Sequence, residues 1–173
     1  MRQRIVIAIA LTADPDCGGV LTYGYFSGEH MTHMDAGRPL FVRKPDAKFT
    51  LANFMRTHLY SAMGSLKLGM KILIGEEKVQ IDKLYGHGGF FKTPGVGQQI
   101  LANALNVPIS TMETAGEGGP WGMALLAAYM VRKEEGETME EYLKNKVFAD
   151  AKSVSVAPDP AGVAGFEVYL NRY

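Results

Sequence analysis

Two glycine-rich turns, each between an expected strand and an expected helix, constrain the fold of this chain most. Residues 86–89 (GHGG) follow the strand-like segment 79–86 (VQIDKLYG) and precede a helical pattern. Residues 116–119 (GEGG) follow a second strand-like segment, 109–113 (ISTME), and precede a second helical pattern over 121–136. The order strand, turn, helix, strand, turn, helix predicts an α/β fold.

Other segments carry clear signals of their own. Apolar residues at three- and four-residue spacing predict a long amphipathic helix over residues 51–73, with Thr50 as its N-cap and Gly75 as its end. Thr93 followed by Pro94 predicts a helix start, because a capping hydroxyl precedes a proline at the first helical position. The remaining expectations are an extended run from residue 20, a third helix near residues 139–147 with an irregular tail after it, and a buried strand or a short helix over residues 5–11.

The first glycine turn comes close to two phosphate-binding motifs without matching either. Glycines between a strand and a helix let the backbone N–H groups and the helix dipole approach an anion. The Walker A pattern G-x-x-x-x-G-K-[ST] finds Gly86, Lys92 and Thr93 in place. However, Phe91 stands where its second glycine belongs. The dinucleotide fingerprint G-x-G-x-x-G finds Gly86 and Gly88, and then meets the same Phe91.

The second glycine turn changes the interpretation of the first. A single glycine cluster between a strand and a helix is equally well explained as a tight structural turn that binds nothing. In a parallel sheet, however, the turns that follow neighbouring strands face the same crevice, where such sheets bind their ligands. Two glycine turns at one edge of the sheet therefore favour a nucleotide.

Composition and charge exclude several classes of function. Eighteen basic residues balance eighteen acidic ones, so no long-range field directs the chain to nucleic acid or to an anionic membrane. The longest apolar run, residues 5–11, is too short to span a bilayer. The single cysteine, Cys17, has no internal partner and is expected to be a free structural thiol, which fits a cytoplasmic protein. We expect a single domain over residues 1–173.

The sequence also resembles the carboxyl-terminal domain of the FGGY carbohydrate kinases, over roughly residues 13–173. The segments GGFFKTPGVGQQILANALNVPI and ETAGEGGPWGMALLAAY follow the family pattern of two glycines, a serine or threonine, Q-x-x-A-[DN]-x-L-x-x-P-[VI], and a later glutamate with G-x-A. The segment YFSGEHMTHMDAGRPLFV is similar to the family loop that contains S-G-E-R, with His30 in place of the arginine. The matching positions are Gly88, Gly89, Thr93, Gln99, Ala102, Asn103, Leu105, Pro108, Ile109, Glu117, Gly122 and Ala124.

This resemblance implies a ribonuclease H-like domain of the actin, hexokinase and sugar-kinase ATPase type, incomplete, with a mixed sheet flanked by helices. It implies ATP as the ligand, with Mg²⁺ held through the nucleotide phosphates. Gly88 and Gly89 would lie against the phosphates and the ribose, and Thr93 near the adenine. Lys92 and Glu117 are the further nucleotide-binding candidates.

The resemblance also implies that the chain is one half of a kinase. In the family, the catalytic aspartate and most of the sugar site lie in an amino-terminal domain, so no catalytic residue and no metal ligand is assigned here. The parent enzyme would phosphorylate a sugar hydroxyl, with xylulose or ribulose as the expected substrate class, and the chain alone is expected to be inactive. The sugar would be bound by the amino-terminal domain, and a homodimer stays open.

Two other functions stay open at this stage. A dinucleotide-dependent oxidoreductase domain would use Gly86 and Gly88, with Glu113 where a ribose-binding acid is expected. A non-catalytic interaction domain of the same fold would bind no nucleotide, and side chains would cover its glycine turns. Phe90 and Phe91 depart from the small residues of the family, and we expect them to be buried in the core or in the wall of an adenine pocket.

Overall fold

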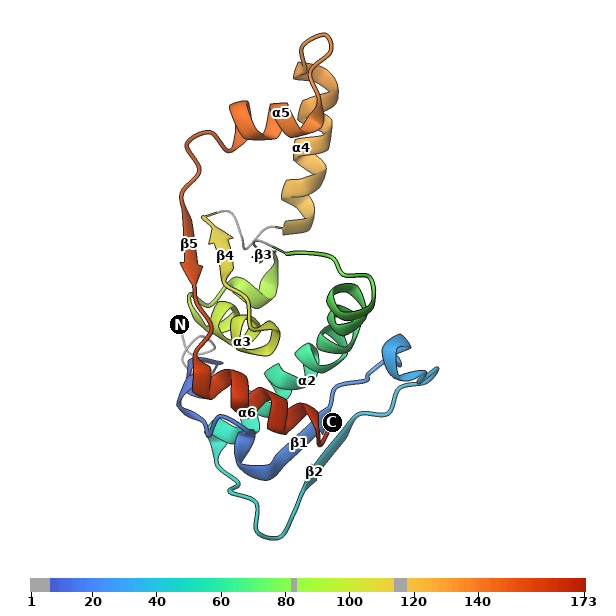
Figure 1. The fold of residues 1–173 in the computed structure, drawn as a ribbon, viewed down its shortest axis with the longest axis vertical. Helices are drawn as coiled ribbons and strands as arrows, with labels where there is room; N and C mark the ends of the chain where they lie inside the picture. The colour runs from blue at the N-terminus through green and yellow to red at the C-terminus, as the bar shows by residue number, and fades with distance from the viewer. Residues whose placement is uncertain (1–6, 82–83, 114–117) are drawn as a thin grey trace.

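The computed structural model describes residues 7–81, 84–113 and 118–173, and these form an elongated molecule (Figure 1). A group of packed helices lies at one end, a small sheet in the middle, and a projecting pair of helices at the other end. The helices are α2 (Leu51–Lys71), α3 (Val96–Leu105), α4 (Gly118–Arg132), α5 (Met139–Tyr142) and α6 (Pro160–Leu170). The strands are β1 (Val20–Tyr23), β2 (Leu40–Arg43), β3 (Leu84–Tyr85), β4 (Ile109–Met112) and β5 (Ser153–Val156).

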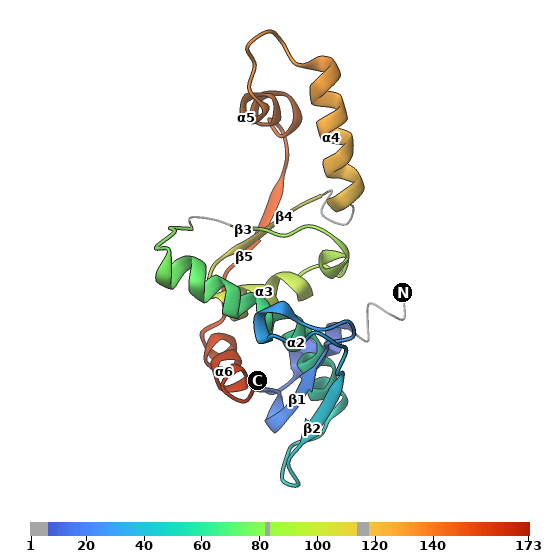
Figure 2. The same cartoon turned by 90° about the vertical axis from the view of Figure 1, so that its right-hand side faces the viewer.

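We call the region in which α2, α3 and α6 pack together the body, and the projecting pair α4 and α5 the arm (Figures 1 and 2). The antiparallel hairpin of β1 and β2 packs on α2 at the far end of the body. The sheet of β3, β4 and β5 lies between the body and the arm. Among residues 7–81, 84–113 and 118–173, no helix combines the length and the apolar character that crossing a bilayer requires.

Helix α2 begins where the sequence predicts it. The Thr50 hydroxyl accepts a hydrogen bond from Asn53 N at 3.1 Å, which satisfies one of the free N–H groups of the first turn. The helix does not end at Gly75 as predicted, because it continues as a π-helical turn, η4 (Ile72–Glu76). Gly64 makes room for the ring of Tyr173, since a Cβ at this position would lie 2.7 Å from two ring atoms.

The core of the body lies between α2, α3 and α6. Tyr60 of α2 packs edge-on against Phe166 and Tyr169 of α6, with ring centroids 4.9 and 5.2 Å apart, and all three rings are fully buried. Burial of one such side chain contributes roughly 1.5–3 kcal/mol to stability. Helix α6 lies close to the segment before β1 because Gly165 has no Cβ. A Cβ at this position would clash with the backbone of Pro15. The other buried members of this cluster are Cys17, Met63, Ile100, Ala104 and Leu170.

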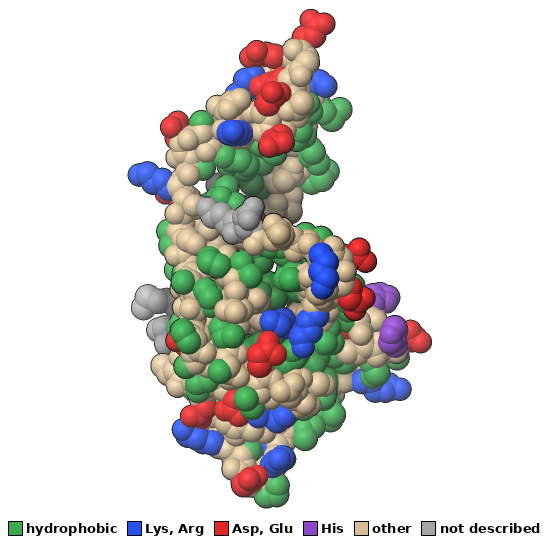
Figure 3. All heavy atoms as spheres, viewed as in Figure 1, with side chains coloured by type: hydrophobic (Ala, Val, Ile, Leu, Met, Phe, Trp, Pro, Cys, Tyr) green, Lys and Arg blue, Asp and Glu red, His purple; other side chains and the backbone are tan. Residues whose placement is uncertain are grey.

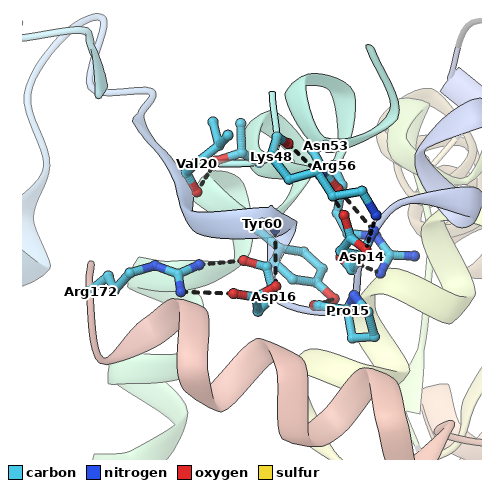
Figure 4. Close-up of polar contacts among 11 residues, drawn as sticks. Asp14, Pro15, Asp16, Val20, Lys48, Asn53, Arg56, Tyr60 and Arg172 are labelled. Atoms are coloured by element: carbon cyan, nitrogen blue, oxygen red, sulfur yellow. Dashed lines mark hydrogen bonds and ion pairs between the residues drawn. The ribbon is translucent and has the colours of Figure 1, made fainter. Parts of the chain in front are cut away.

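Polar contacts anchor the segment before β1 to the body (Figure 4). Buried Arg56 donates hydrogen bonds to three carbonyl oxygens, those of Ala10 (2.8 Å), Leu11 (3.1 Å) and Asp14 (3.1 Å). The Asp14 carboxylate accepts from the Asn53 amide at 2.7 Å, and Arg172, just after α6, pairs with Asp16 at 2.9 Å. The hydrogen bond from Asn53 is the largest cause that holds the pKa of Asp14 below its usual range. These contacts tie the segment before β1 to α2 and to the carboxyl-terminal end of the chain.

The structure corrects the expected irregular tail after residue 147. It also decides between a strand and a helix near the amino terminus. Residues after 147 are not an irregular tail, because β5 pairs antiparallel with β4 and α6 follows. Helix α6 starts at Asp159, which accepts a hydrogen bond from Gly162 N at 2.8 Å and precedes Pro160. Near the amino terminus, Ile9–Thr12 form a 3-10 helix, η1, rather than a strand. The expected mixed sheet flanked by helices is confirmed.

Candidate functional site

Strands β3 and β4 run parallel, so their carboxyl ends lie at the same edge of the sheet. The register pairs Leu84 with Ile109 and Tyr85 with Ser110. The pairing ends with a hydrogen bond of 2.8 Å from Gly86 N to Ser110 O. The first glycine turn therefore leaves the sheet beside the strand that the second glycine turn follows.

The described end of the second glycine-rich segment contacts the first turn. Gly118, the first residue of α4, lies against the first turn. A Cβ on Gly118 would be 3.0 Å from His87 Cβ and 3.1 Å from Gly88 N, which is tighter than side chains normally allow. The expectation that both turns share one edge of the sheet is confirmed by this contact and by the parallel register.

The first turn is partly exposed at Gly88 and exposed at Gly89. Gly88 has a φ of +100°, a conformation that only glycine adopts readily. A Cβ at Gly88, Gly89 or Gly119 would meet no neighbouring part of the described chain within 4 Å. After Gly88 the chain forms a 3-10 helix, η5 (Gly89–Phe91), closed by a hydrogen bond of 3.1 Å from Phe91 N to Gly88 O. An uncovered glycine backbone at the end of a strand is the kind of surface that phosphate groups approach.

The ring of Phe91 explains why the turn departs from the two standard motifs. It packs directly on Gly86, whose missing Cβ provides the space for the ring. Gly86 therefore serves packing, and the dinucleotide fingerprint loses the first of its glycines. Phe90 packs against the core cluster, and its carbonyl oxygen lies against Gly97 of α3. The expectation of core packing is confirmed for Phe90.

The remaining nucleotide-binding candidates follow the turn or lie beyond it. Thr93 is not the N-cap predicted for α3, because Gly95 takes a φ of +77° and the helix begins at Val96. Thr93 is half-buried, and its carbonyl oxygen accepts a hydrogen bond from Val96 N at 3.3 Å. Lys92 is exposed at the end of η5. Glu117 lies outside the described residues.

Sequence reasoning missed a cavity of about 230 Å³ where β4 ends. Glu113 and Trp121 line it, together with Phe148 and Lys152 from the segment before β5. Trp121 Nε1 is buried and has no hydrogen-bond partner in the part of the chain that the structure describes. The only tryptophan of the sequence, placed just after a glycine turn, is the signal that could have found this cavity.

Cys17 has the structural role expected of it. The side chain is fully buried in the core cluster, and it forms no disulfide. Burial raises the pKa of the thiol, because the charged thiolate would lose its hydration. The thiol is therefore neutral and inert at physiological pH.

Known kinases share the fold of nearly the whole chain. The xylulose kinase from Lactobacillus acidophilus is 22% identical, with a TM-score of 0.74. The gluconate kinase from the same organism is 20% identical with a TM-score of 0.70, and the Plasmodium falciparum glycerol kinase is 16% identical with a TM-score of 0.69. Each comparison covers 97% of this chain and 32% of the kinase. The chain therefore has the carboxyl-terminal part of the actin and hexokinase type of ATPase fold.

The family follows from the sequence itself. The model of the "FGGY family of carbohydrate kinases, C-terminal domain" matches residues 7–131, which is more than half of the chain. The chain belongs to this family, as its resemblance implied. No curated protein sequence matches it. Because the chain spans about a third of the length of the solved kinases, the activity of a whole kinase is a proposal for it.

Proposed function

We propose that this chain forms the ATP-binding side of a carbohydrate kinase, in which the γ-phosphoryl group of ATP is transferred to a sugar hydroxyl. The observation that carries the proposal is the contact between the two glycine turns. Gly118 lies against Gly88, while Gly89 and Gly119 are exposed and the Cβ positions of Gly88, Gly89 and Gly119 are open. The Plasmodium falciparum glycerol kinase of similar fold was solved with ADP, which supports a nucleotide as the ligand.

Within this site the residues of the chain would hold the nucleotide in position. Gly88 and Gly89 would contact the phosphates and the ribose, Thr93 would lie near the adenine, and Lys92 and Glu117 would add charged contacts. Phosphoryl transfer depends mainly on such positioning and on neutralisation of charge. Mg²⁺ would be held through the nucleotide phosphates.

We propose a pentulose such as xylulose as the acceptor. Xylulose kinases from Lactobacillus acidophilus and Brucella ovis share the fold, the latter with 21% identity and a TM-score of 0.70. The catalytic base and most of the sugar site would come from an amino-terminal domain, so the chain alone should bind nucleotide weakly and phosphorylate nothing. We place the reaction in the cytoplasm, where a free thiol such as Cys17 stays reduced. A homodimer of the chain stays a prediction, which sedimentation velocity tests.

Calorimetric titration with ATP and Mg²⁺ tests the proposal, with Gly89→Val as the key variant. Gly89 has no positive φ and nothing lies near its missing Cβ, so the fold accepts a valine. That valine would nevertheless cover the backbone that the phosphates need. We expect ATP affinity to fall by at least about tenfold, the loss of one charge-assisted hydrogen bond. Gly75→Val, at a glycine in η4 with equally open surroundings, is the matched control and should bind ATP unchanged.

Four results would contradict the proposal or a part of it. The unmodified chain could give no heat with ATP, or both valine variants could bind ATP equally well. Binding of NAD in place of ATP would instead favour an oxidoreductase domain. Phosphorylation of xylulose by the isolated chain would show that the catalytic base lies within these 173 residues.

A further inference from the structure

A cavity of about 440 Å³ lies on the side of the body, among α2, η4, α3 and α6. Its volume is within the range of cavities that hold small organic ligands. Figure 3 shows a hollow on this face with hydrophobic side chains around it and charged side chains on its rim. The lining residues are Lys67, Met70, Lys71, Ile74, Gly75, Leu105, Asn106, Val107 and Glu167.

This cavity is separate from the glycine turns. Leu105 and Val107 line it, and they lie between the end of α3 and the start of β4. The glycine turns, by contrast, follow the carboxyl ends of β3 and β4. The two places are at opposite ends of the same strand. The cavity therefore takes no part in the nucleotide site proposed above, and a ligand could occupy it whether or not the glycine turns bind ATP.

Most of the cavity wall is apolar. Met70 of α2, Ile74 of η4 and Leu105 of α3 supply it, together with Val107. The π-helical turn exposes three consecutive apolar side chains, Ile72, Leu73 and Ile74, each close to two-fifths accessible. Consecutive apolar residues on a surface are unfavourable unless something covers them, and π-helical turns often occur at functional sites.

One charged group that lines the cavity has donors to spare. The side chain of Lys67 is 14% exposed, and its ammonium group pairs with Glu167 Oε1 at 3.1 Å. An ammonium group has three donors, and this pair is the one contact of Lys67 Nζ within the described residues. The described residues leave the other donors of this ammonium group unused, so these donors can hydrogen-bond an anionic ligand. Lys71, exposed at the rim of the cavity, adds a second positive charge.

We propose that this cavity binds a small carboxylate with an apolar tail. The carboxylate would accept hydrogen bonds from Lys67, beside the carboxylate of Glu167, and Lys71 would offset the excess of negative charge. The tail would lie along Met70, Ile74 and Leu105. Apolar burial supplies affinity at such a site, and the ammonium group selects an anionic head.

Octanoate is a suitable probe, and calorimetric titration of the 173-residue chain measures its binding. We expect Lys67→Met to weaken octanoate binding by about tenfold or more, because a charge-assisted hydrogen bond is lost. The variant should still fold, since Glu167 is 43% exposed and stays hydrated. Lys44→Met removes the same charge from an exposed loop position and is the matched control.

A second variant fills the cavity while both lysines stay in place. Gly75 lines the cavity and has open space at its missing Cβ, so Gly75→Leu should fold and should abolish octanoate binding. Octylamine, with the same tail and a positive head, should not bind, and 1-octanol should bind at least about tenfold more weakly than octanoate.

Several outcomes would overturn the proposal. One is equal affinity for octanoate and octanol, and another is octanoate binding that survives Gly75→Leu or Lys67→Met. Loss of octanoate binding in Val131→Ser would place the ligand on the exposed face of α4 instead, since Val131 is 84% exposed there. Circular dichroism of each variant verifies that the helices are retained.

Discussion

The body and the arm are both helical and rich in apolar residues, yet they bury their side chains to very different degrees. In the body, Tyr60, Phe166 and Tyr169 are fully buried in one cluster. In the arm, no residue of α4 is buried, although Arg132 is its only charged residue. Figure 2 shows the arm standing clear of the body. A helix that is apolar on every side is normally covered by other protein, so α4 has more apolar surface than its present neighbours cover.

Local contacts hold the arm together in place of a core. The Tyr129 and Tyr142 rings of α4 and α5 meet with centroids 5.5 Å apart, and Tyr129 Oη donates to Glu137 O at 2.7 Å. The Thr138 and Glu141 side chains form a capping box at the start of α5. These contacts specify the turn between the helices, and they leave the opposite face of α4 open. The sequence of α4 thus predicts the helix itself, but it does not predict which part of a protein covers the apolar face of the helix.

The largest effect is expected from truncating the core of the body. Phe166→Ala removes a fully buried ring and leaves a cavity beside Tyr60, so we expect a loss of about 3–5 kcal/mol in the free energy of unfolding. Urea denaturation measures the change. A loss below about 1 kcal/mol would mean that the body is no better packed than the arm.

Loss of the buried guanidinium group should have the next largest effect. Arg56→Ala leaves three carbonyl oxygens without their donor. We therefore expect the free energy of unfolding to fall by about 2–3 kcal/mol. Arg56→Lys is the control, because it keeps the charge but cannot reproduce the planar fork of donors. Its stability should fall between those of the alanine variant and the wild type, as denaturation with urea would show. Equal stability of all three proteins would show that the Arg56 side chain does not anchor the segment before β1.

The sequence predicted those elements that depend on local signals. Helix α2 with its Thr50 cap and strand β4 were expected from neighbouring residues, and the position of both glycine turns at one edge was expected from the order of strands and helices. Strand β5 was missed, because its pairing with β4 is a contact between segments distant in sequence. The start of α3 was misplaced because the left-handed backbone of Gly95 cannot be read from the Thr93-Pro94 pair.

For the candidate site, the residue types were predictable but their roles were not. Gly86 belonged to both near-matching motifs, and the structure shows that it accommodates the Phe91 ring. The contact of Gly118 with Gly88 depends on the parallel register, which no local pattern encodes. Nucleotide binding by Gly88, Gly89 and Thr93 stays a prediction.

A smaller effect is expected from acidification. The folded pKa of Asp14 lies below its unfolded value, so its contribution is fully present above about pH 4 and is lost as pH falls through the folded pKa. Asp14→Asn should therefore cost less than about 1 kcal/mol at pH 6, with the difference from the wild type shrinking toward about pH 2.5. Urea denaturation at both pH values measures it. A difference that grows on acidification would contradict this assignment.

The smallest effect is expected in the arm. Met130 is 77% exposed on α4, so Met130→Ala should change the free energy of unfolding by no more than about 0.5 kcal/mol. It is the arm counterpart of Phe166→Ala, measured in the same denaturation series. A loss of about 2 kcal/mol or more, the cost of truncating a core methionine, would show that α4 is covered in solution, for instance by a second copy of the chain.

NMR can show whether the two glycine turns act together as one phosphate-binding surface, on which the proposed function rests. Backbone amide resonances of the ¹⁵N-labelled chain are followed during titration with ATP and Mg²⁺. We predict that the amides of Gly88, Gly89, Gly118 and Gly119 shift together and saturate with a single dissociation constant. Shifts confined to one turn, or found only around the cavity lined by Lys67, would mean that the two turns do not form a common site.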